Sequence, residues 1–395
     1  MSAMTRRLGT SMVVGLLALA GAAACGGSEI PRSTRTTTVT PSTTATPSPT
    51  PESVLNGPSV VVARQLSDDS RVLVAYDLYD GTTRELATLQ REDHPTVDAT
   101  GTAVVVEQYT GTPDPWRQAW GESGTGSHLV LIDLTTGARR ELTPEHSGVF
   151  DRQPAWNRSG DGWVYFLRVG PAVTTETSWA GADLWRVSPV TGDLQKVPHG
   201  AVQQAPADTG IRQFVLEPGG RTAWVQTDLF IETGGQNQAV GRLDLATGRV
   251  TRHPYDPGPD LGQGVSLAWS PDGAWFALTD NAGGVPPSAG LAIQRWPDGE
   301  ARGLMSRQPD TEGATWTWEE FGQVGWHPDD SAVVLRVTRL SGDTAVEVPV
   351  GTPVGGTPVG SRILLVDITD GSSTPIGPAS VDDQSFDVWA PPATS

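Results

Sequence analysis

The stretch LVLIDLTTGARREL, residues 129–142, decides the fold: an alternating apolar run leads into Asp-x-x-x-Gly, and a second short run follows. Apolar residues at every second position predict a half-buried strand. The carboxylate of Asp133 can accept hydrogen bonds from backbone N–H groups ahead of it, and Gly137 supplies a positive φ. The stretch therefore predicts a β-hairpin rather than a catalytic motif.

The same hairpin recurs along the chain, with turn glycines separated by 56, 55, 56, 51 and 72 residues. Three other copies keep the turn aspartate, at Asp77, Asp244 and Asp367, whereas Ser188 and Arg295 replace it in two more. An internal repeat of this period indicates an array of similar units. The six turn glycines are Gly81, Gly137, Gly192, Gly248, Gly299 and Gly371.

A second hairpin precedes each Asp/Gly turn, and LAWSPDGAWFAL, residues 267–278, is its best copy. Two hairpins make one four-stranded unit. The sixth copy of the second hairpin is only FDVWAP, residues 386–391, at the C-terminus, so we expect this strand to complete the first unit and close a ring. Aligned copies place one set of residues in a shared slot: Val97, Trp156, Leu216, Trp269, Trp326 and Trp389.

These motifs, WSPDG followed by (I/L)-x-(V/L)-D-(L/I)-x-(T/D)-G, resemble those of the TolB-like β-propellers, a WD-repeat-like family. The resemblance covers roughly Ser59–Pro392. It implies an all-β, six-bladed β-propeller over residues 59–395, closed by the C-terminal strand. The motifs are specific for the fold and not for a function, because this scaffold carries binding modules, enzymes and spacers alike.

The N-terminus predicts export. Residues 1–24 contain two arginines, an apolar run over Met12–Ala20 and then small residues, as a signal peptide does. The single cysteine, Cys25, follows directly, and its Gly-Gly-Ser context resembles bacterial lipoprotein signals. That resemblance implies cleavage before Cys25, a lipid on its sulfur and a place on the outer face of the cytoplasmic membrane. Ala22 stands where such signals usually have Leu, so secretion without lipid is the alternative. Residues 25–58 are rich in Thr, Ser and Pro and predict a disordered tether.

Composition excludes several functions. The chain has 27 basic and 45 acidic residues and a net charge of −18, which makes nucleic acid a poor partner. Lys196 is the single lysine, a bias that fits a high-GC, actinobacterial genome. The six histidines show no metal-binding spacing, and no Gly-x-Ser-x-Gly or phosphate-binding loop is present. The sequence therefore predicts no catalytic residue, metal or cofactor, and His327 is expected to be a surface turn residue.

Propeller geometry would place the tight first and third turns of each unit on one face and the long, irregular segments on the other. Six tryptophans fit the core, at positions 156, 163, 269, 275, 326 and 389. Other tryptophans fall in the irregular segments or in the connections between blades, and residues 316–321 are expected to form such a connection. Large aromatics there favour partner contact; the alternative is that they cover the edges of their own blades. The candidate partner-binding residues are Trp116, Arg117, Trp120, Trp179, Trp316, Trp318, Glu319 and Glu320.

Three function classes follow. The first hypothesis is a lipid-anchored, non-enzymatic binding or scaffold module whose partner is an unknown cell-envelope protein. The competing hypothesis is an enzyme or small-ligand sensor that acts on envelope sugars or peptides in the central channel, and a ring that serves only as a spacer is a third. A site formed by two or more of six residues would favour the competing hypothesis: His94, Glu145, His146, Asp151, Arg152 and Glu320.

Overall fold

The fold consists of β-strands that follow the predicted hairpins. The computed structural model describes residues 53–67, 70–111, 126–170, 182–199, 210–230, 236–252, 266–279, 289–296, 301–306, 310–312, 315–343, 357–380 and 383–391. All of them belong to one compact unit, Pro51–Ser395. The leader and most of the tether, Cys25 included, lie outside the described residues.

The described part of the chain is all-β and forms five hydrogen-bonded sheets. Within it, no helix has the length and apolar character needed to cross a membrane. The first sheet has the order β25 (Asp383–Trp389), β1 (Ser59–Ser67), β2 (Ser70–Asp77) and β3 (Thr83–Leu89). The second has eight strands: β4 (Glu92–Val97), β5 (Ala103–Thr110), β6 (Gly126–Asp133), β7 (Arg139–Glu141), β8 (Phe150–Trp156), β9 (Val164–Val169), β10 (Asp183–Val187) and β11 (Leu194–Lys196).

The remaining three sheets also run in sequence order. The third contains β12 (Ile211–Leu216), β13 (Thr222–Phe230), β14 (Gln236–Asp244) and β15 (Val250–Arg252). The fourth contains β16 (Leu267–Trp269), β17 (Trp275–Thr279), β18 (Ala289–Arg295) and β19 (Ala301–Ser306). The fifth contains β20 (Asp310–Glu312), β21 (Thr315–Trp326), β22 (Ala332–Asp343), β23 (Thr357–Asp367) and β24 (Ser373–Ser380).

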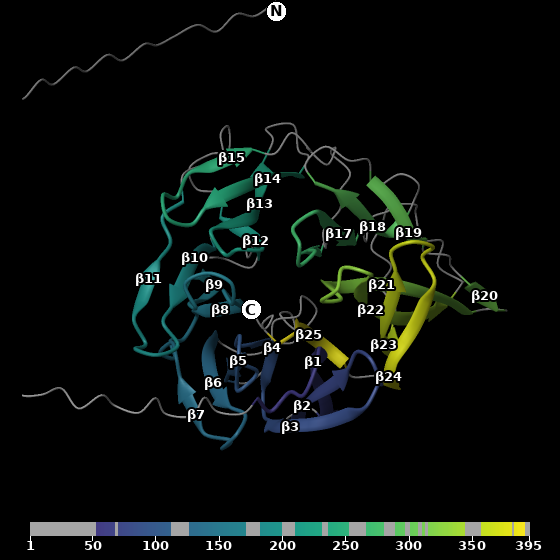
Figure 1. Cartoon of the computed structure of the whole chain (residues 1–395), viewed down its shortest axis with the longest axis horizontal. Coiled ribbons are helices and arrows are strands. Elements are labelled where there is room, and N and C mark those ends of the chain that lie inside the picture. The colour runs from purple at the N-terminus through teal and green to yellow at the C-terminus, as the bar shows by residue number, and fades with distance from the viewer. Residues whose placement is uncertain are drawn as a thin grey trace, which may run out of the picture. The chain divides into compact units, whose positions relative to one another are not determined.

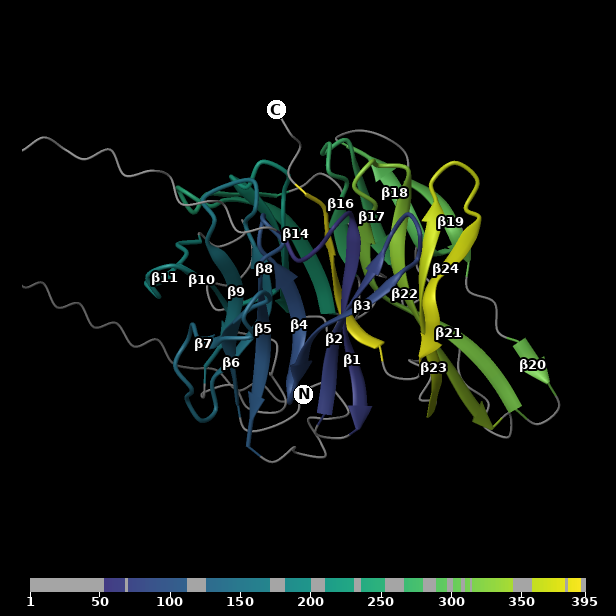
Figure 2. The same cartoon turned by 60° about the horizontal axis from the view of Figure 1, so that its bottom comes forward.

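The sheets stand around a common centre as in a propeller (Figure 1), and their strands run between the two faces of the ring (Figure 2). The residues of the predicted shared slot are the last residues of β4, β8, β12, β16, β21 and β25. β25 pairs antiparallel with β1, from Ser59↔Trp389 to Arg64↔Asp383, so the last strand of the chain lies beside the first.

The number of separate sheets differs from the predicted six. One parallel backbone pair, Ser127↔Phe150, links β6 to β8 and merges two predicted four-stranded units into the eight-stranded sheet. The merger has a local cause: the N–H group of Ser127 donates to the carbonyl of Val149 (3.0 Å), immediately before β8 begins. The repeat did not predict this contact, because the connection between β7 and β8 is not part of the repeated hairpin pattern.

The predicted Asp/Gly turns are confirmed wherever the structure describes them. Oδ1 of Asp133 accepts hydrogen bonds from the N–H groups of Thr135 (2.9 Å) and Thr136 (2.8 Å), and Gly137 has φ +70°. These backbone hydrogen bonds hold the pKa of the exposed Asp133 carboxyl below its ordinary value, although slight burial acts in the opposite direction. In the copy with Ser188 in place of the aspartate, Oγ of Ser188 accepts a hydrogen bond from the N–H group of Thr191 (3.1 Å) and stabilises the turn in the same way. Gly299 lies outside the described residues.

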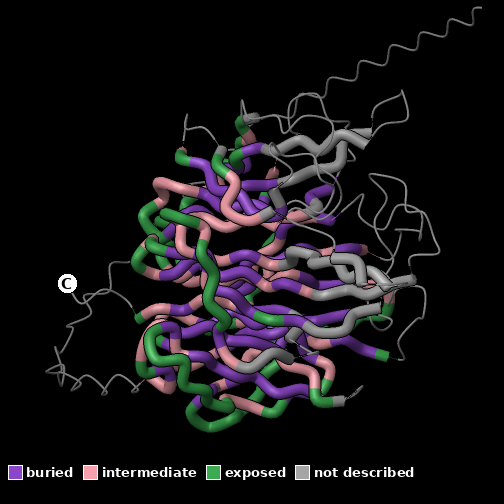
Figure 3. The backbone as a smooth tube through the Cα atoms, turned by 90° about the vertical axis from the view of Figure 1, so that its right-hand side faces the viewer, coloured by how far each residue is buried: buried purple, intermediate pink, exposed green. Residues whose placement is uncertain are grey.

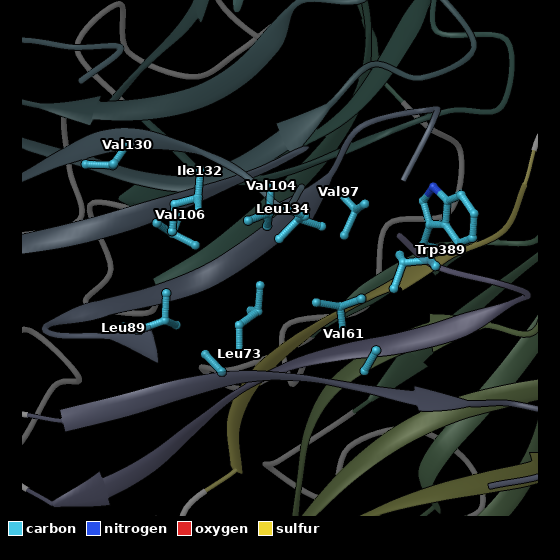
Figure 4. Packing of buried hydrophobic residues seen from close by; sticks show 13 residues of the cluster. Val61, Leu73, Leu89, Val97, Val104, Val106, Val130, Ile132, Leu134 and Trp389 are labelled. Carbon is cyan, nitrogen blue, oxygen red and sulfur yellow. The ribbon is translucent and has the colours of Figure 1, made fainter. Parts of the chain in front are cut away.

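The core lies between the faces of neighbouring sheets. Buried side chains of the first sheet, such as Leu73 and Trp389, pack against Val97, Val104 and Ile132 of the second (Figure 4). Most strands are largely buried or half-buried, except for β3, β7 and β11, and the other exposed positions gather at the turns (Figure 3). The predicted core tryptophans are confirmed. Trp326 and Trp389 are buried. The other four are half-buried and pack against the core: Trp156, Trp163, Trp269 and Trp275.

One arginine connects three of the innermost strands. Arg158, in the turn after β8, donates to the backbone carbonyls of Val97 (2.7 Å) and Val388 (2.8 Å) and forms an ion pair with Asp387. Asp387 Oδ2 also accepts a hydrogen bond from Val97 N–H (2.7 Å). β25 is thus attached to β4 and to the turn after β8 by polar contacts as well as to β1 by backbone pairing.

Two turn glycines provide a matched test of this fold. Gly137 (φ +70°) has open space where a Cβ would stand, whereas a Cβ on Gly248 (φ +71°) would lie 2.4 Å from the carbonyl oxygen of Pro198. Gly137→Ala should cost about 1–2 kcal/mol of unfolding free energy, from left-handed backbone strain alone. Gly248→Ala should cost clearly more, because the backbone must also shift. Urea denaturation of both variants measures the difference, and equal losses would contradict the placement of Pro198.

Candidate functional site

The predicted partner-binding residues fall into two groups in the structure. Trp116, Arg117, Trp120 and Trp179 lie outside the described residues, so their role stays a prediction. The other four, Trp316, Trp318, Glu319 and Glu320, belong to β21.

The placement of 316–321 in a connecting segment was therefore wrong. The backbone of these residues pairs with β22, for example Trp316↔Gly342 and Glu320↔Thr338. The physical reason is local: Thr and Trp alternate before the glutamates, and such residues favour strands. Their contact with a partner stays a prediction.

His327 also differs from its expectation as a surface turn residue. Its side chain is buried, and Nδ1 lies 2.5 Å from Oδ1 of Asp329 within the turn. The imidazole packs edge-on against the ring of Tyr79, with 5.6 Å between the ring centroids. His327 is thus part of the packing between the first and fifth sheets.

Three residues named for the channel alternative do come together. His94 and Arg152 both lie close to the carboxylate of Glu107, and the negative charge of Glu107 also acts on Asp151. Glu145 and His146 are exposed in the connection before β8, and Glu320 lies in β21. The site is built from the innermost strands β4 and β8 and from β5, with β25 alongside.

The two innermost strands share an irregularity at this point. β4 and β8 contain His94-Pro95 and Gln153-Pro154, and both ladders shift register there. His94 has φ +48° and Gln153 has φ +52°. Non-glycine residues rarely adopt positive φ, and such strain persists where the surroundings over-determine it, often at functional sites. Because proline has no N–H to donate, the ladder is already interrupted beside each strained residue.

His94 and Glu107 form the centre of the site. Nδ1 of His94 lies 3.2 Å from Oε2 of Glu107, whose side chain is fully buried, whereas 36% of the His94 side chain is exposed. Nδ1 itself is buried, so the exposed part of the side chain lies away from this nitrogen. Burial lowers the pKa of His94, but the charges of Asp93 and Glu107 outweigh it and hold the pKa above its ordinary value of 6.5.

The Glu107 carboxylate is incompletely paired. Arg152 Nε lies 4.0 Å from Oε1, and the backbone N–H of Gln153 reaches Oε2 at 3.4 Å. Oε1 has no hydrogen-bond partner among the described residues. A buried carboxylate in this condition favours a positive charge on a neighbour, and the group that can acquire one is His94.

Asp93 fixes the backbone of His94. Its Oδ1 accepts from the N–H of His94 (2.8 Å), and Oδ2 lies 3.5 Å from Nη1 of Arg71. Ser385 of β25 hydrogen-bonds to Asp93, and its Oγ accepts from the same N–H of His94 (2.8 Å). The strained conformation of His94 is thus held from the first sheet as well as from its own strand.

Asp151 is neutralised by a separate partner. Arg168 donates from Nε and Nη2 to the two carboxylate oxygens at 2.6 and 2.7 Å. Burial nevertheless raises the pKa of Asp151, against the opposing effect of Arg168. Tyr109 lies in the same environment, and burial together with the charges of Glu107 and Asp93 raises the pKa of its hydroxyl.

Buried charge concentrates in this part of the molecule. Five carboxylate residues are buried among the described residues, and Glu217 alone lies elsewhere. The other four are Glu92, Asp93, Glu107 and Asp151. Burying charge costs free energy unless it is well paired, so such a concentration is a mark of a functional site. Where the structure describes the chain, no group of three or more His, Cys, Asp or Glu side chains could hold a metal ion.

The site lies at the ring face opposite the tight turns. The Asp98 and Asp133 turns close one end of β4, β5 and β6, whereas Glu107 is near the other end of β5, three residues before Thr110. Thr110 is followed by the segment that carries Trp116 and Trp120 in the sequence.

Sequence reasoning did not identify Glu107, Asp93, Arg168 or Ser385 as members of this site. A signal was present for one of them, because Glu107 interrupts the apolar run AVVV of β5. The pairing partners come from β25, β8 and β9, which are distant in the sequence, and no local pattern links them.

No protein-family model matches the chain, and no curated protein matches it. Solved structures do match. Hydrazine synthase from Kuenenia stuttgartiensis has a TM-score of 0.51 and 10% identity, over 85% of this chain and 47% of that one. A putative TolB from Agrobacterium tumefaciens gives 0.45 and 12%, over 83% and 91%. Oligogalacturonate lyase from Vibrio parahaemolyticus gives 0.43 and 11%, over 68% and 71%.

At these identities the likeness shows the fold alone. The neighbours include a TolB and enzymes of different kinds, so they favour neither an enzymatic nor a non-enzymatic function. The described part of the chain is all-β, and its sheets are arranged as in a propeller.

Proposed function

We propose that the protein is an exported, lipid-anchored β-propeller that binds a cell-envelope partner and has no enzymatic activity of its own. The signal peptide over residues 1–24 and the context of Cys25 support export and lipidation. The Thr/Ser/Pro-rich composition of residues 25–58 supports a tether that holds the ring away from the membrane. The acidic net charge of −18 argues against nucleic acid as the partner.

We further propose that the ring has six blades closed by β25. The eight-stranded sheet supports this count, because its halves β4–β7 and β8–β11 are joined by one backbone pair only. A buried cluster lies between those halves and includes Val105 and Leu129 from one and Val164 and Phe166 from the other. Two halves that pack face to face in this way behave as two blades.

The observation that carries the binding function is the difference between the two faces of the ring. On one face, tight turns satisfy their own polar groups, as at Asp133 and Asp244. On the other face lie the strained and charged ends of β4 and β8. Irregular segments on a rigid scaffold are the usual place for binding residues.

A capture experiment tests both parts of the proposal. The intact protein is crosslinked in its own cells, isolated from the membrane fraction, and compared with two variants. Cys25→Ser should move the protein out of the membrane fraction, because the lipid attachment site is lost. Replacing Trp116, Trp120, Trp316 and Trp318 with Ala should leave it in the membrane fraction and reduce partner capture at least tenfold, as loss of aromatic contact residues does.

The control for this experiment comes from the opposite face. Val190 is 85% exposed in a tight turn, so Val190→Ala removes exposed apolar surface without touching the proposed interface. Capture by the control should equal that of the unmodified protein. Unaltered capture by the tryptophan variant, with an unchanged thermal transition, would refute the proposed surface.

A ligand-sensing or enzymatic function at the ring centre is the second candidate. The convergence of His94, Arg152 and Asp151 around Glu107 favours it specifically. Among the described residues no serine, threonine or cysteine side chain is hydrogen-bonded to the ring nitrogens of His94, so ligand recognition is better supported than hydrolysis by an activated hydroxyl or thiol.

A further inference from the structure

We propose that His94 and Glu107 form a recognition site for a carboxylate group of a small ligand that enters the ring beside β25, β4 and β8. This inference does not depend on the partner-binding surface. It rests on the half-buried imidazole of His94, which lies 3.2 Å from the buried and incompletely paired carboxylate of Glu107.

The first step is the orientation of the imidazole. Nδ1 is buried and faces Oε2 of Glu107 at 3.2 Å, while 36% of the His94 side chain is exposed, so we place this exposure at the edge that carries Nε2. Hydrogen bonds from the N–H of His94 to Asp93 and Ser385, both at 2.8 Å, hold the backbone in its strained conformation. A histidine fixed in this way presents a preoriented donor to a ligand, which reduces the entropy lost on binding.

The second step is the charge balance around the imidazole. The cluster around His94 contains four carboxylates and four guanidinium groups. Their charges sum to zero while His94 is neutral. A proton on His94 gives the cluster one net positive charge, on its exposed member. The eight groups are Glu92, Asp93, Glu107 and Asp151, and Arg71, Arg139, Arg152 and Arg168.

The third step is the missing partner of Glu107. Oε1 accepts no hydrogen bond among the described residues, although the side chain is fully buried. Glu107 therefore favours the protonated form of His94. The protonated Nδ1 then faces Oε2 of Glu107 at 3.2 Å, which leaves Nε2–H for an acceptor outside. An anionic acceptor fits best, because a charge-assisted hydrogen bond is about twice as strong as a neutral one.

The ligand carboxylate can come from a sugar acid or from a peptide C-terminus, and the test separates these sources. D-glucuronate is compared with D-glucose, and N-acetyl-Ala-Ala with its C-terminal amide. Binding is followed through the Cε1–Hε1 signals of the six histidines by NMR on the full mature chain, and His94→Gln identifies the His94 signal. At least one carboxylate should shift that signal, and its neutral analogue should not.

Dependence on pH distinguishes recognition from a purely structural role. Affinity for the carboxylate should be highest when His94 is protonated and should fall by up to about tenfold per pH unit above the pKa of His94. In Glu107→Gln the midpoint of His94 titration should move down, so carboxylate binding at pH 7 should weaken about tenfold and return at lower pH. His146→Gln is the matched control, because His146 is exposed in the connection before β8; its carboxylate binding should be unchanged.

Two results would overturn the proposal. The first is a His94 signal that shifts with pH in the unmodified protein, and so reports protonation, but responds to neither carboxylate. The second is an equal response to each carboxylate and its neutral analogue. Both results come from the unmodified chain, so they hold even if a variant fails to fold.

Discussion

Removing residues 383–395 should leave a chain that does not fold cooperatively at 25 °C. The deletion takes away β25 and with it the innermost strand of the first sheet, including the buried side chains of Phe386 and Trp389. Losing a buried Phe or Trp side chain costs about 3–5 kcal/mol each. Two such losses approach the whole stability of a typical domain, about 5–15 kcal/mol.

The deletion also removes polar contacts between sheets. Arg158 loses the carbonyl of Val388 and the carboxylate of Asp387, and the N–H group of Val97 loses its acceptor. Circular dichroism and tryptophan fluorescence during urea titration should show loss of the cooperative transition. The control is a variant that ends at Pro391 and keeps β25. Its urea transition should have the same midpoint as that of the complete chain. A cooperative transition of unchanged midpoint in the longer deletion would show that β25 contributes nothing to the ring.

The repeat pattern was sufficient to predict the hairpins and their turns. Asp133 and Gly137 act within one local segment, so their roles depend on a few neighbouring residues and survive any tertiary arrangement. The shared slot was equally predictable, since each of its residues ends an innermost strand. For the same reason Ser188 could replace aspartate without loss of the turn.

Contacts between repeats were much harder to predict. The pairing of Ser127 with Phe150 and the position of Ser385 beside His94 depend on residues that follow no period. The burial of Glu107 was unexpected, because charged side chains are usually exposed. β21 shows another limit: residues 316–321 have strand propensity of their own, yet the comparison with other repeats suggested a connection.

Replacing Arg168 with Met should destabilise the protein by about 3–5 kcal/mol at pH 7, because it leaves the carboxylate of Asp151 buried without its partner. Asp151 has a side-chain exposure of 1%, and Arg168 supplies two hydrogen bonds to it. Methionine keeps much of the aliphatic volume of Arg168, so lost charge rather than lost packing dominates the effect. Urea denaturation at pH 7 measures the loss.

The pH dependence of this variant follows from the pKa of Asp151. Burial already raises that pKa above its value of 3.8 in the unfolded chain, and removal of Arg168 should raise it further. The folded state then binds the Asp151 proton more tightly than the unfolded state does. The penalty is therefore complete above the folded pKa and shrinks as the pH falls toward 3.8. Arg168→Met should therefore recover more stability than the unmodified protein does as the pH falls from 7 toward 3.8.

A double variant separates charge from packing. Asp151→Asn combined with Arg168→Met removes both charges, so it should recover most of the stability lost in Arg168→Met and should lose the recovery at low pH. Asp151→Asn alone should cost less than Arg168→Met, because Arg168 is 16% exposed and can reach water. If the double variant is as unstable as Arg168→Met at every pH, the loss comes from packing. Pairing with the buried carboxylate of Asp151 would then not be the stabilising role of Arg168.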